Sequence, residues 1–150
     1  MCPLANPSAP AAPSGPRPGP ALCSEAEIER LVDAFYARVR ADARLGPVFA
    51  EAVHDWPAHL ATLVDFWSAM LRGTRRFSGA PVQRHNALPG LDAAMFERWL
   101  ALFRQTTAEL GNRDMQQLAD AMAGQVAANL LARYRGAGEA APGRLDRPRR

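Results

Sequence analysis

The sequence contains no lysine, only two cysteines and no long apolar run. All 18 basic residues are arginine, which suggests a GC-rich, bacterial genome rather than a mechanism. Cys2 and Cys23 form no CxxC pair and lie in or beside a proline-rich stretch, which argues against a disulfide framework and fits a reducing cytosol. Neither an apolar run of about 18 residues nor a signal-peptide pattern is present, so we expect a cytoplasmic protein without a membrane segment.

Prolines and unbalanced charge are confined to the two ends of the chain. Seven of the 13 prolines fall within the first 20 residues, so we expect residues 1–23 to form a disordered Pro-rich tail. Residues 136–150 are expected to form a disordered, arginine-containing tail. The remaining 24–135 hold 13 Arg and 13 Asp or Glu, so the folded domain is formally neutral. The basic pI therefore gives no support for nucleic acid binding.

Within residues 24–135, apolar residues recur at helical spacing and no strand pattern is present, so the fold class is all-α. Four long helices are expected: three start at the capping residues Ser24, Asp55 and Asp92, and the last starts at about Asn112. Three of them are expected to stop at glycines, namely Gly73, Gly111 and Gly136. Short helical pieces are expected at 45–52 and 81–87.

One histidine follows this helical pattern on a short, stiff connection. Gly79 and Pro81 open the segment that delivers His85, opposite the wide apolar face of the preceding helix. A neutral imidazole held in this way can ligate the iron of a flat, apolar cofactor. Nearby, Arg75, Arg76 and Arg84 could pair with acidic groups of such a cofactor, although adjacent arginines are more often part of a solvated loop.

Three further side chains combine a polar group with an apolar position. Tyr36 stands at the edge of the first apolar stripe, His59 heads an apolar row with Leu63, Phe66 and Met70, and Trp99 lies beside other aromatics. Each has an ordinary structural use as a core or rim residue whose polar atom finds a backbone or water partner.

Taken together, the motifs resemble those of the group III truncated haemoglobins, also called the P group. The motifs, in order, are FYxxVRxDxxLGPxF at 35–49, WxxH at 56–59, FWxxML at 66–71, GxPxxxH at 79–85 and FxxWLxLF at 96–103. The absence of Gly-Gly pairs also suits this group. Phe77 stands where the family often has a tyrosine, and the two tails have no family counterpart.

This resemblance implies a two-over-two helical sandwich around haem b, with His85 as the proximal iron ligand. It places Tyr36, His59 and Trp99 on the distal side, where ligands bind. The walls of the haem pocket are then expected to include Phe49, Leu63, Phe66, Trp67, Met70 and Leu71. The haem propionates are expected to pair with arginines from Arg75, Arg76 and Arg84.

The resemblance favours reversible binding of oxygen or another diatomic ligand, such as nitric oxide or carbon monoxide, at a five-coordinate iron with a polar distal pocket. The alternative is a haem enzyme that removes nitric oxide, peroxide or related species with an external reductase, and the residues leave open whether the protein is an enzyme. A third possibility is a cofactor-free helical interaction domain. A monomer is the default expectation.

Overall fold

The structure is a computed structural model that describes residues 15–77 and 92–140. The described residues contain no strand and form five α-helices: α1 Glu25–Ala41, α2 Leu45–Ala52, α3 Trp56–Arg72, α5 Ala93–Ala108 and α6 Arg113–Ala140. The expected all-α class is confirmed, and α2 coincides with the short helix expected at 45–52. The piece expected at 81–87 lies outside the described residues.

Local side-chain caps explain where the long helices begin. Ser24 and Glu27 form the expected capping box, in which the Ser24 hydroxyl accepts from the Glu27 N–H at 3.1 Å and the Glu27 carboxylate accepts from the Ser24 N–H at 3.1 Å. The Asp55 side chain caps α3 by accepting from the Ala58 N–H, and the Asp92 side chain caps α5 by accepting from the Met95 N–H. Asn112 accepts from the N–H of Met115 at 3.1 Å and so begins α6.

The predicted positions of the helix ends agree with the structure at some glycines and not at others. Gly73 ends α3 in the left-handed conformation with φ of 73°, as expected. Gly111 has φ of 75° and lies in the turn between α5 and α6. The expectation that Gly136 ends the last helix was wrong, because α6 continues to Ala140. A glycine without a positive φ costs a helix only about 1 kcal/mol and does not stop it.

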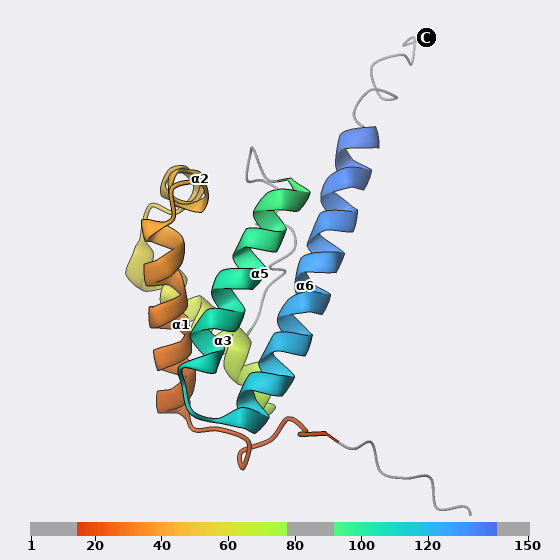
Figure 1. Ribbon diagram of the computed structural model, residues 1–150. Helices are drawn as coiled ribbons and strands as arrows, with labels where there is room; N and C mark the ends of the chain where they lie inside the picture. The colour runs from red at the N-terminus through yellow and green to blue at the C-terminus, as the bar shows by residue number, and fades with distance from the viewer. Residues whose placement is uncertain (1–14, 78–91, 141–150) are drawn as a thin grey trace, which may run out of the picture.

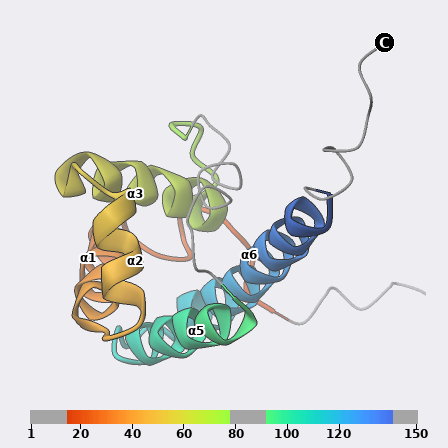
Figure 2. The ribbon, with the colours of Figure 1, turned by 90° about the horizontal axis from the view of Figure 1, so that it is seen from above.

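The four long helices form two pairs. Figure 1 shows α5 and α6 side by side in opposite directions, with α1 beside α5. Seen from above in Figure 2, α3 and α5 lie on opposite sides of α1. Since α1 packs on α3, α5 packs on α6, α1 meets α5 and α3 meets α6, the pairs stack in the expected two-over-two arrangement.

The core lies between these pairs and is rich in aromatic rings. Phe35 of α1 is only 1% exposed and makes edge contacts with Tyr36, Trp99 and Phe103 at centroid distances of 4.9, 5.2 and 5.1 Å. Trp67 of α3 stacks on Phe103 at 5.0 Å. In the described part of the chain, no helix is both long enough and apolar enough to cross a membrane.

Residues 15–23, which the sequence analysis assigned to the disordered tail, make defined contacts with the helices. The Gly19 N–H donates to the Leu71 carbonyl at 2.9 Å, and the Leu22 carbonyl accepts from the Asn112 amide at 3.0 Å. Cys23 is buried, and its carbonyl accepts from Arg72 at 2.8 Å. These contacts come mostly from backbone groups, so the pattern of apolar side chains gave no sign of them.

Candidate functional site

The structure brings Tyr36, Phe49 and His59 together from three different helices. The Tyr36 ring on α1 lies edge-on to Phe49 of α2 at a centroid distance of 6.1 Å and to His59 of α3 at 5.8 Å. Trp56, at the start of α3, contacts Tyr36 at 6.1 Å and His59 at 5.6 Å. This aromatic cluster places one phenol and one imidazole beside each other in otherwise apolar surroundings.

Trp99 of α5 joins the aromatic cluster through a hydrogen bond to Tyr36. Burial strongly raises the pKa of the Tyr36 phenol, and a side-chain hydrogen bond with Trp99 partly offsets this rise. An indole N–H can only donate, so the Tyr36 oxygen is the acceptor. The phenol therefore stays protonated at neutral pH, and its own O–H remains available to a second acceptor.

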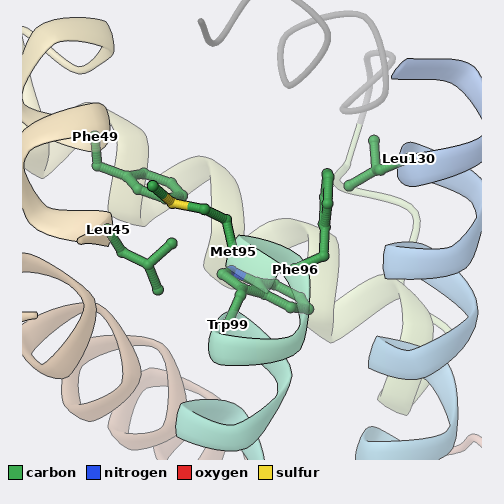
Figure 3. A pocket seen from close by; sticks show the side chains of 6 residues that line it. All are labelled: Leu45, Phe49, Met95, Phe96, Trp99 and Leu130. Atoms are coloured by element: carbon green, nitrogen blue, oxygen red, sulfur yellow. The ribbon is translucent and has the colours of Figure 1, made fainter. Parts of the chain in front are cut away.

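An apolar hollow opens beside Trp99, between α2, α5 and α6 (Figure 3). It is lined by Leu45, Phe49, Met95, Phe96, Trp99 and Leu130. The Met95 side chain extends toward Phe49, while Phe96 and Leu130 face each other from α5 and α6. All six side chains are apolar or aromatic, so this surface favours an apolar group over a charged one.

Sequence reasoning missed part of this lining. Leu45, Met95, Phe96 and Leu130 were not predicted as binding residues. Phe96 and Met95 stand three and four positions before Trp99, so helical periodicity could have placed them on the Trp99 side of α5. Leu130 lies on a distant stretch of the chain, and nothing local in the sequence relates it to Trp99.

The predicted pocket residues of α3 divide into two groups. Leu63, Trp67 and Leu71 are buried, and Trp67 packs on Phe103 in the core between the helix pairs. Phe66 and Met70 are half-buried, and Phe66 contacts Phe77 at 5.3 Å. The half-buried pair therefore offers an apolar surface on α3 in addition to the one that the hollow provides.

The remaining predicted residues are the iron ligand and the arginines expected to meet the propionates. His85 and Arg84 lie outside the residues that the structure describes. Arg75 is exposed at the end of the described segment that follows α3. Arg76 is half-exposed and pairs with Glu25 at 2.8 Å and with Asp65 at 3.1 Å.

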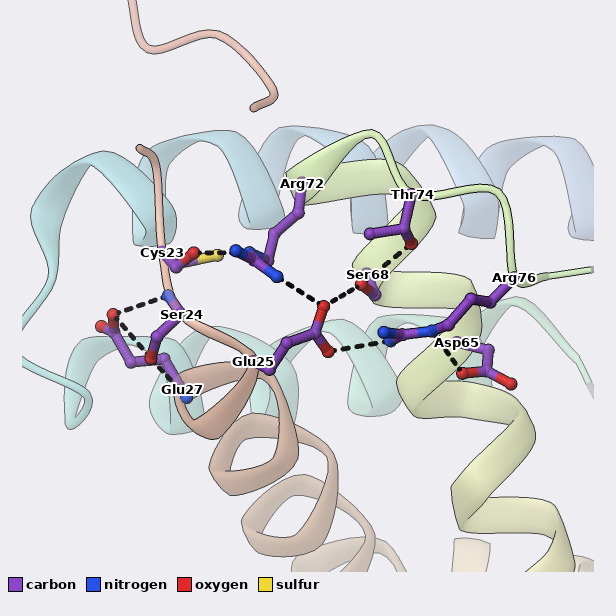
Figure 4. A network of polar contacts seen from close by, with 9 residues as sticks. All are labelled: Cys23, Ser24, Glu25, Glu27, Asp65, Ser68, Arg72, Thr74 and Arg76. Carbon is purple, nitrogen blue, oxygen red and sulfur yellow. Dashed lines mark hydrogen bonds and ion pairs between the residues drawn. The ribbon is translucent and has the colours of Figure 1, made fainter. Parts of the chain in front are cut away.

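These arginine contacts belong to a polar network that joins the start of α1 to the end of α3 (Figure 4). One Glu25 oxygen accepts from the Ser68 hydroxyl at 2.6 Å and from Arg72 at 2.6 Å, while the other accepts from Arg76. The Thr74 hydroxyl donates to Ser68 at 3.0 Å. Hydrogen bonds from Arg76 and Ser68 lower the pKa of the Glu25 carboxyl to about 2, so the network is charged at neutral pH.

The described residues fit the apolar part of a haem site. A porphyrin needs apolar side chains against its faces and edges, and polar groups only near the iron and the propionates. The hollow and the half-buried face of α3 supply the apolar side chains. Tyr36 and His59 supply polar groups within the aromatic cluster. The assignment of these residues to the distal side of a haem stays a prediction from the sequence motifs.

Comparison with known proteins gives three concordant matches. The family model for bacterial-like globins matches residues 21–129. The group 3 truncated haemoglobin of Campylobacter jejuni is 32% identical over 120 residues, which cover 75% of this chain and 94% of that protein. The crystal structure of a group III truncated haemoglobin from Campylobacter jejuni matches with a TM-score of 0.70 at 30% identity, covering 75% of this chain and 91% of that chain.

Proposed function

Because this chain belongs to the bacterial-like globins and, within them, to the group III truncated haemoglobins, we propose that it binds haem b and uses it to hold oxygen or another small diatomic ligand. Nitric oxide and carbon monoxide are further ligands of this class. In this proposal His85 is the proximal ligand of a five-coordinate iron, which leaves the distal position open. The protein works in the cytoplasm as a monomer.

The haem would be held by apolar walls and by arginines at its edge. The proposed walls combine the predicted residues with those of the hollow: Phe49, Leu63, Phe66, Trp67, Met70, Leu71, Leu45, Met95, Phe96 and Leu130. Arg75, Arg76 and Arg84 are the proposed partners of the propionates. Arg76 already binds two carboxylates, so a propionate would have to replace Glu25 or Asp65 at its guanidinium.

The observation that carries the proposal is the aromatic cluster, in which Tyr36 lies edge-on to His59 at 5.8 Å and interacts with Trp99. When bound, haem supplies an iron atom that takes up the diatomic ligand and polarises it. Because the Tyr36 oxygen accepts from Trp99, the phenol directs its own proton to another acceptor. A polarised ligand in the aromatic cluster would be that acceptor, and Trp99 would keep the phenol in the donating orientation.

The size of this effect predicts a slow release of ligand. One net hydrogen bond stabilises a complex by about 0.5–1.5 kcal/mol, and about 1.4 kcal/mol changes affinity tenfold. His59 lies edge-on to Tyr36 with ring centroids 5.8 Å apart, and in this proposal it is a further donor. Two donors, Tyr36 and His59, would make the protein a poor oxygen carrier and a better trap or reaction site.

The test is the rate of oxygen dissociation from the reduced haem protein, compared between wild type, Tyr36→Phe and Trp99→Phe. We expect dissociation to be about tenfold faster or more in Tyr36→Phe, and faster by a smaller factor in Trp99→Phe. Thr107→Val is the control, because it removes a buried hydroxyl that hydrogen-bonds to Asp120 at 2.7 Å, at the end of α5 away from the hollow. Unchanged rates in both cluster variants would refute the donor model.

The same donor also favours a second candidate function. Negative charge develops on nitric oxide and peroxide substrates during their conversion at a haem, and Tyr36, held in its donating orientation by Trp99, would stabilise it. This enzyme would need an external reductase. Turnover of nitric oxide or peroxide faster than by free haem, with loss of that advantage in Tyr36→Phe, would favour the enzyme over simple ligand binding.

A further inference from the structure

Asp42, at the end of α1, makes hydrogen bonds in two directions. One of its oxygens accepts from the N–H groups of Arg44 and Leu45, both at 3.0 Å, and the other accepts from the Arg98 guanidinium at 2.7 Å. Its side chain is only 5% exposed, whereas that of Arg98 is 53% exposed. The single carboxylate therefore ties the start of α2 and the middle of α5 to the end of α1.

In the connection from α1 to α2, the backbone at Gly46 packs too closely against α1 to admit a side chain. The Gly46 N–H donates to the Asp42 carbonyl at 2.9 Å, and a Cβ atom on Gly46 would lie 2.6 Å from the Arg40 carbonyl oxygen. Only glycine fits at this distance. The close approach at this corner therefore fixes the start of α2 against the last turn of α1, in addition to the packing of the buried Leu45 and Phe49.

The two helices that Asp42 joins form facing walls of the apolar hollow. Leu45 and Phe49 come from α2, while Met95 and Trp99 come from α5. Arg98 immediately precedes Trp99 in the chain. The ion pair therefore spans the two walls and lies next to the residue that donates to Tyr36.

We propose that Asp42 and Arg98 are positioning residues of the ligand pocket, which set the gap between α2 and α5 and the direction in which Trp99 reaches Tyr36. The inference rests on the proposed function, because it assigns the pair a role in the strength of the distal hydrogen bond. Neither residue touches the ligand in this account. Their effect passes through Trp99 and Phe49.

A second ion pair between α1 and α5 provides a matched control. Arg38 pairs with Glu109 at 2.5 Å and donates to Thr106 at 2.9 Å, near the other end of α5 and away from the hollow. Both pairs include a well-exposed partner, so removal of either arginine should lower stability by a similar, small amount. Only loss of the Asp42 pair should alter the pocket.

The experiment compares full-length wild type, Arg98→Met, Arg98→Lys and Arg38→Met by two methods. The first is the nuclear magnetic resonance signal of the Trp99 indole N–H in the haem-free protein, assigned with Trp99→Phe. The second is the carbon–oxygen stretching frequency of the carbon monoxide complex, with the oxygen dissociation rate, after haem is supplied. The stretching frequency reports the electrostatic field at the ligand, which a purely structural ion pair would not change.

We expect Arg98→Met to shift the indole signal and the stretching frequency and to speed oxygen dissociation about three- to tenfold. Arg98→Lys should change the indole signal, the stretching frequency and the dissociation rate less than Arg98→Met does. Arg38→Met should leave these three readings unchanged. The inference is overturned if Arg98→Met leaves the indole signal in place, or if Arg38→Met shifts the readings equally. If no variant takes up haem, the proposed function fails, whereas the indole signal still decides whether the pair positions Trp99.

Discussion

The two ends of the α1–α3 pair are built from opposite chemistry. At one end, Glu25 gathers Ser68, Arg72 and Arg76 into a partly exposed network of charged hydrogen bonds. At the other, Tyr36 and His59 lie among aromatic rings, where Tyr36 is only 3% exposed. The same two helices thus carry a charged clasp, defined by the four residues of the first end, and the aromatic cluster.

This contrast indicates that the two ends have different roles, the clasp in stability and the aromatic cluster in ligand binding. Charged bonds near water are individually weak but keep two helix ends in register. A buried phenol among rings has few possible partners, so each hydrogen bond that it makes is directional and strong. We therefore expect changes at the clasp to affect stability without affecting ligands, and changes at the aromatic cluster to affect ligands most.

The largest loss of stability is expected where the aromatic cluster meets the core. Phe35→Ala removes a ring that is 1% exposed and that contacts Tyr36, Trp99 and Phe103. The free energy of unfolding should fall by about 3–5 kcal/mol, since a cavity replaces the ring. Chemical denaturation measures this, and Phe35→Leu should lose clearly less. A loss below about 1 kcal/mol in Phe35→Ala would show that this ring is not central to the core.

A smaller loss is expected at the charged clasp. Glu25→Gln removes the charge that Arg72 and Arg76 share, and we expect the free energy of unfolding to fall by about 1–2 kcal/mol. Oxygen dissociation should not change. Glu29→Gln, one turn further along α1 and exposed, is the control, because Glu29 forms no ion pair within the described segments. Faster oxygen release in Glu25→Gln would contradict the division between the two ends.

The clasp should also be visible as a dependence of stability on pH. The Glu25 pKa in the folded protein is about 2, below its ordinary value of 4.5. Its contribution is therefore complete above pH 4.5 and is lost progressively as the pH falls toward 2. Denaturation curves between pH 2.5 and 6 should decline less steeply in Glu25→Gln than in wild type. Parallel declines would show that Glu25 does not titrate in this way.

The smallest effect is expected at the outer edge of the clasp. Arg76 and Asp65 are 3.1 Å apart, with side chains 48% and 40% exposed. Asp65→Asn should change the free energy of unfolding by no more than about 0.5 kcal/mol, and this change should disappear in 1 M salt. A loss as large as that in Glu25→Gln would mean that the clasp extends to Asp65.

The parts of the fold that the sequence predicted are those set by local chemistry. Ser24, Asp55 and Asp92 cap helices through bonds to N–H groups within three residues, so their role is visible in a short window. Gly73 ends α3 because its left-handed conformation suits glycine. By contrast, the same residue type at position 136 lies within α6, because a helix can include a glycine when nothing requires it to turn.

The candidate site was predictable only where a family pattern relates distant residues. That resemblance related Tyr36 of α1 to Trp99 of α5, two residues that interact in the structure, and their role at a ligand stays a prediction. The clasp joins Glu25 to Ser68 across 43 positions, and no periodicity indicates such a contact. The lining by Leu130 was likewise missed, since it depends on how α6 packs against α5.

The most direct test of the haem assignment is a titration of the purified full-length protein with haem, followed by absorption spectra of the ferric and the carbon monoxide ferrous forms. We predict a sharp Soret band that saturates at one haem per chain. The band should be lost or weakened in His85→Ala and partly restored there by added imidazole. It should be unchanged in His54→Ala, because His54 is exposed between α2 and α3. Failure of the wild type to take up haem, or a His85→Ala spectrum identical to that of wild type, would contradict the account.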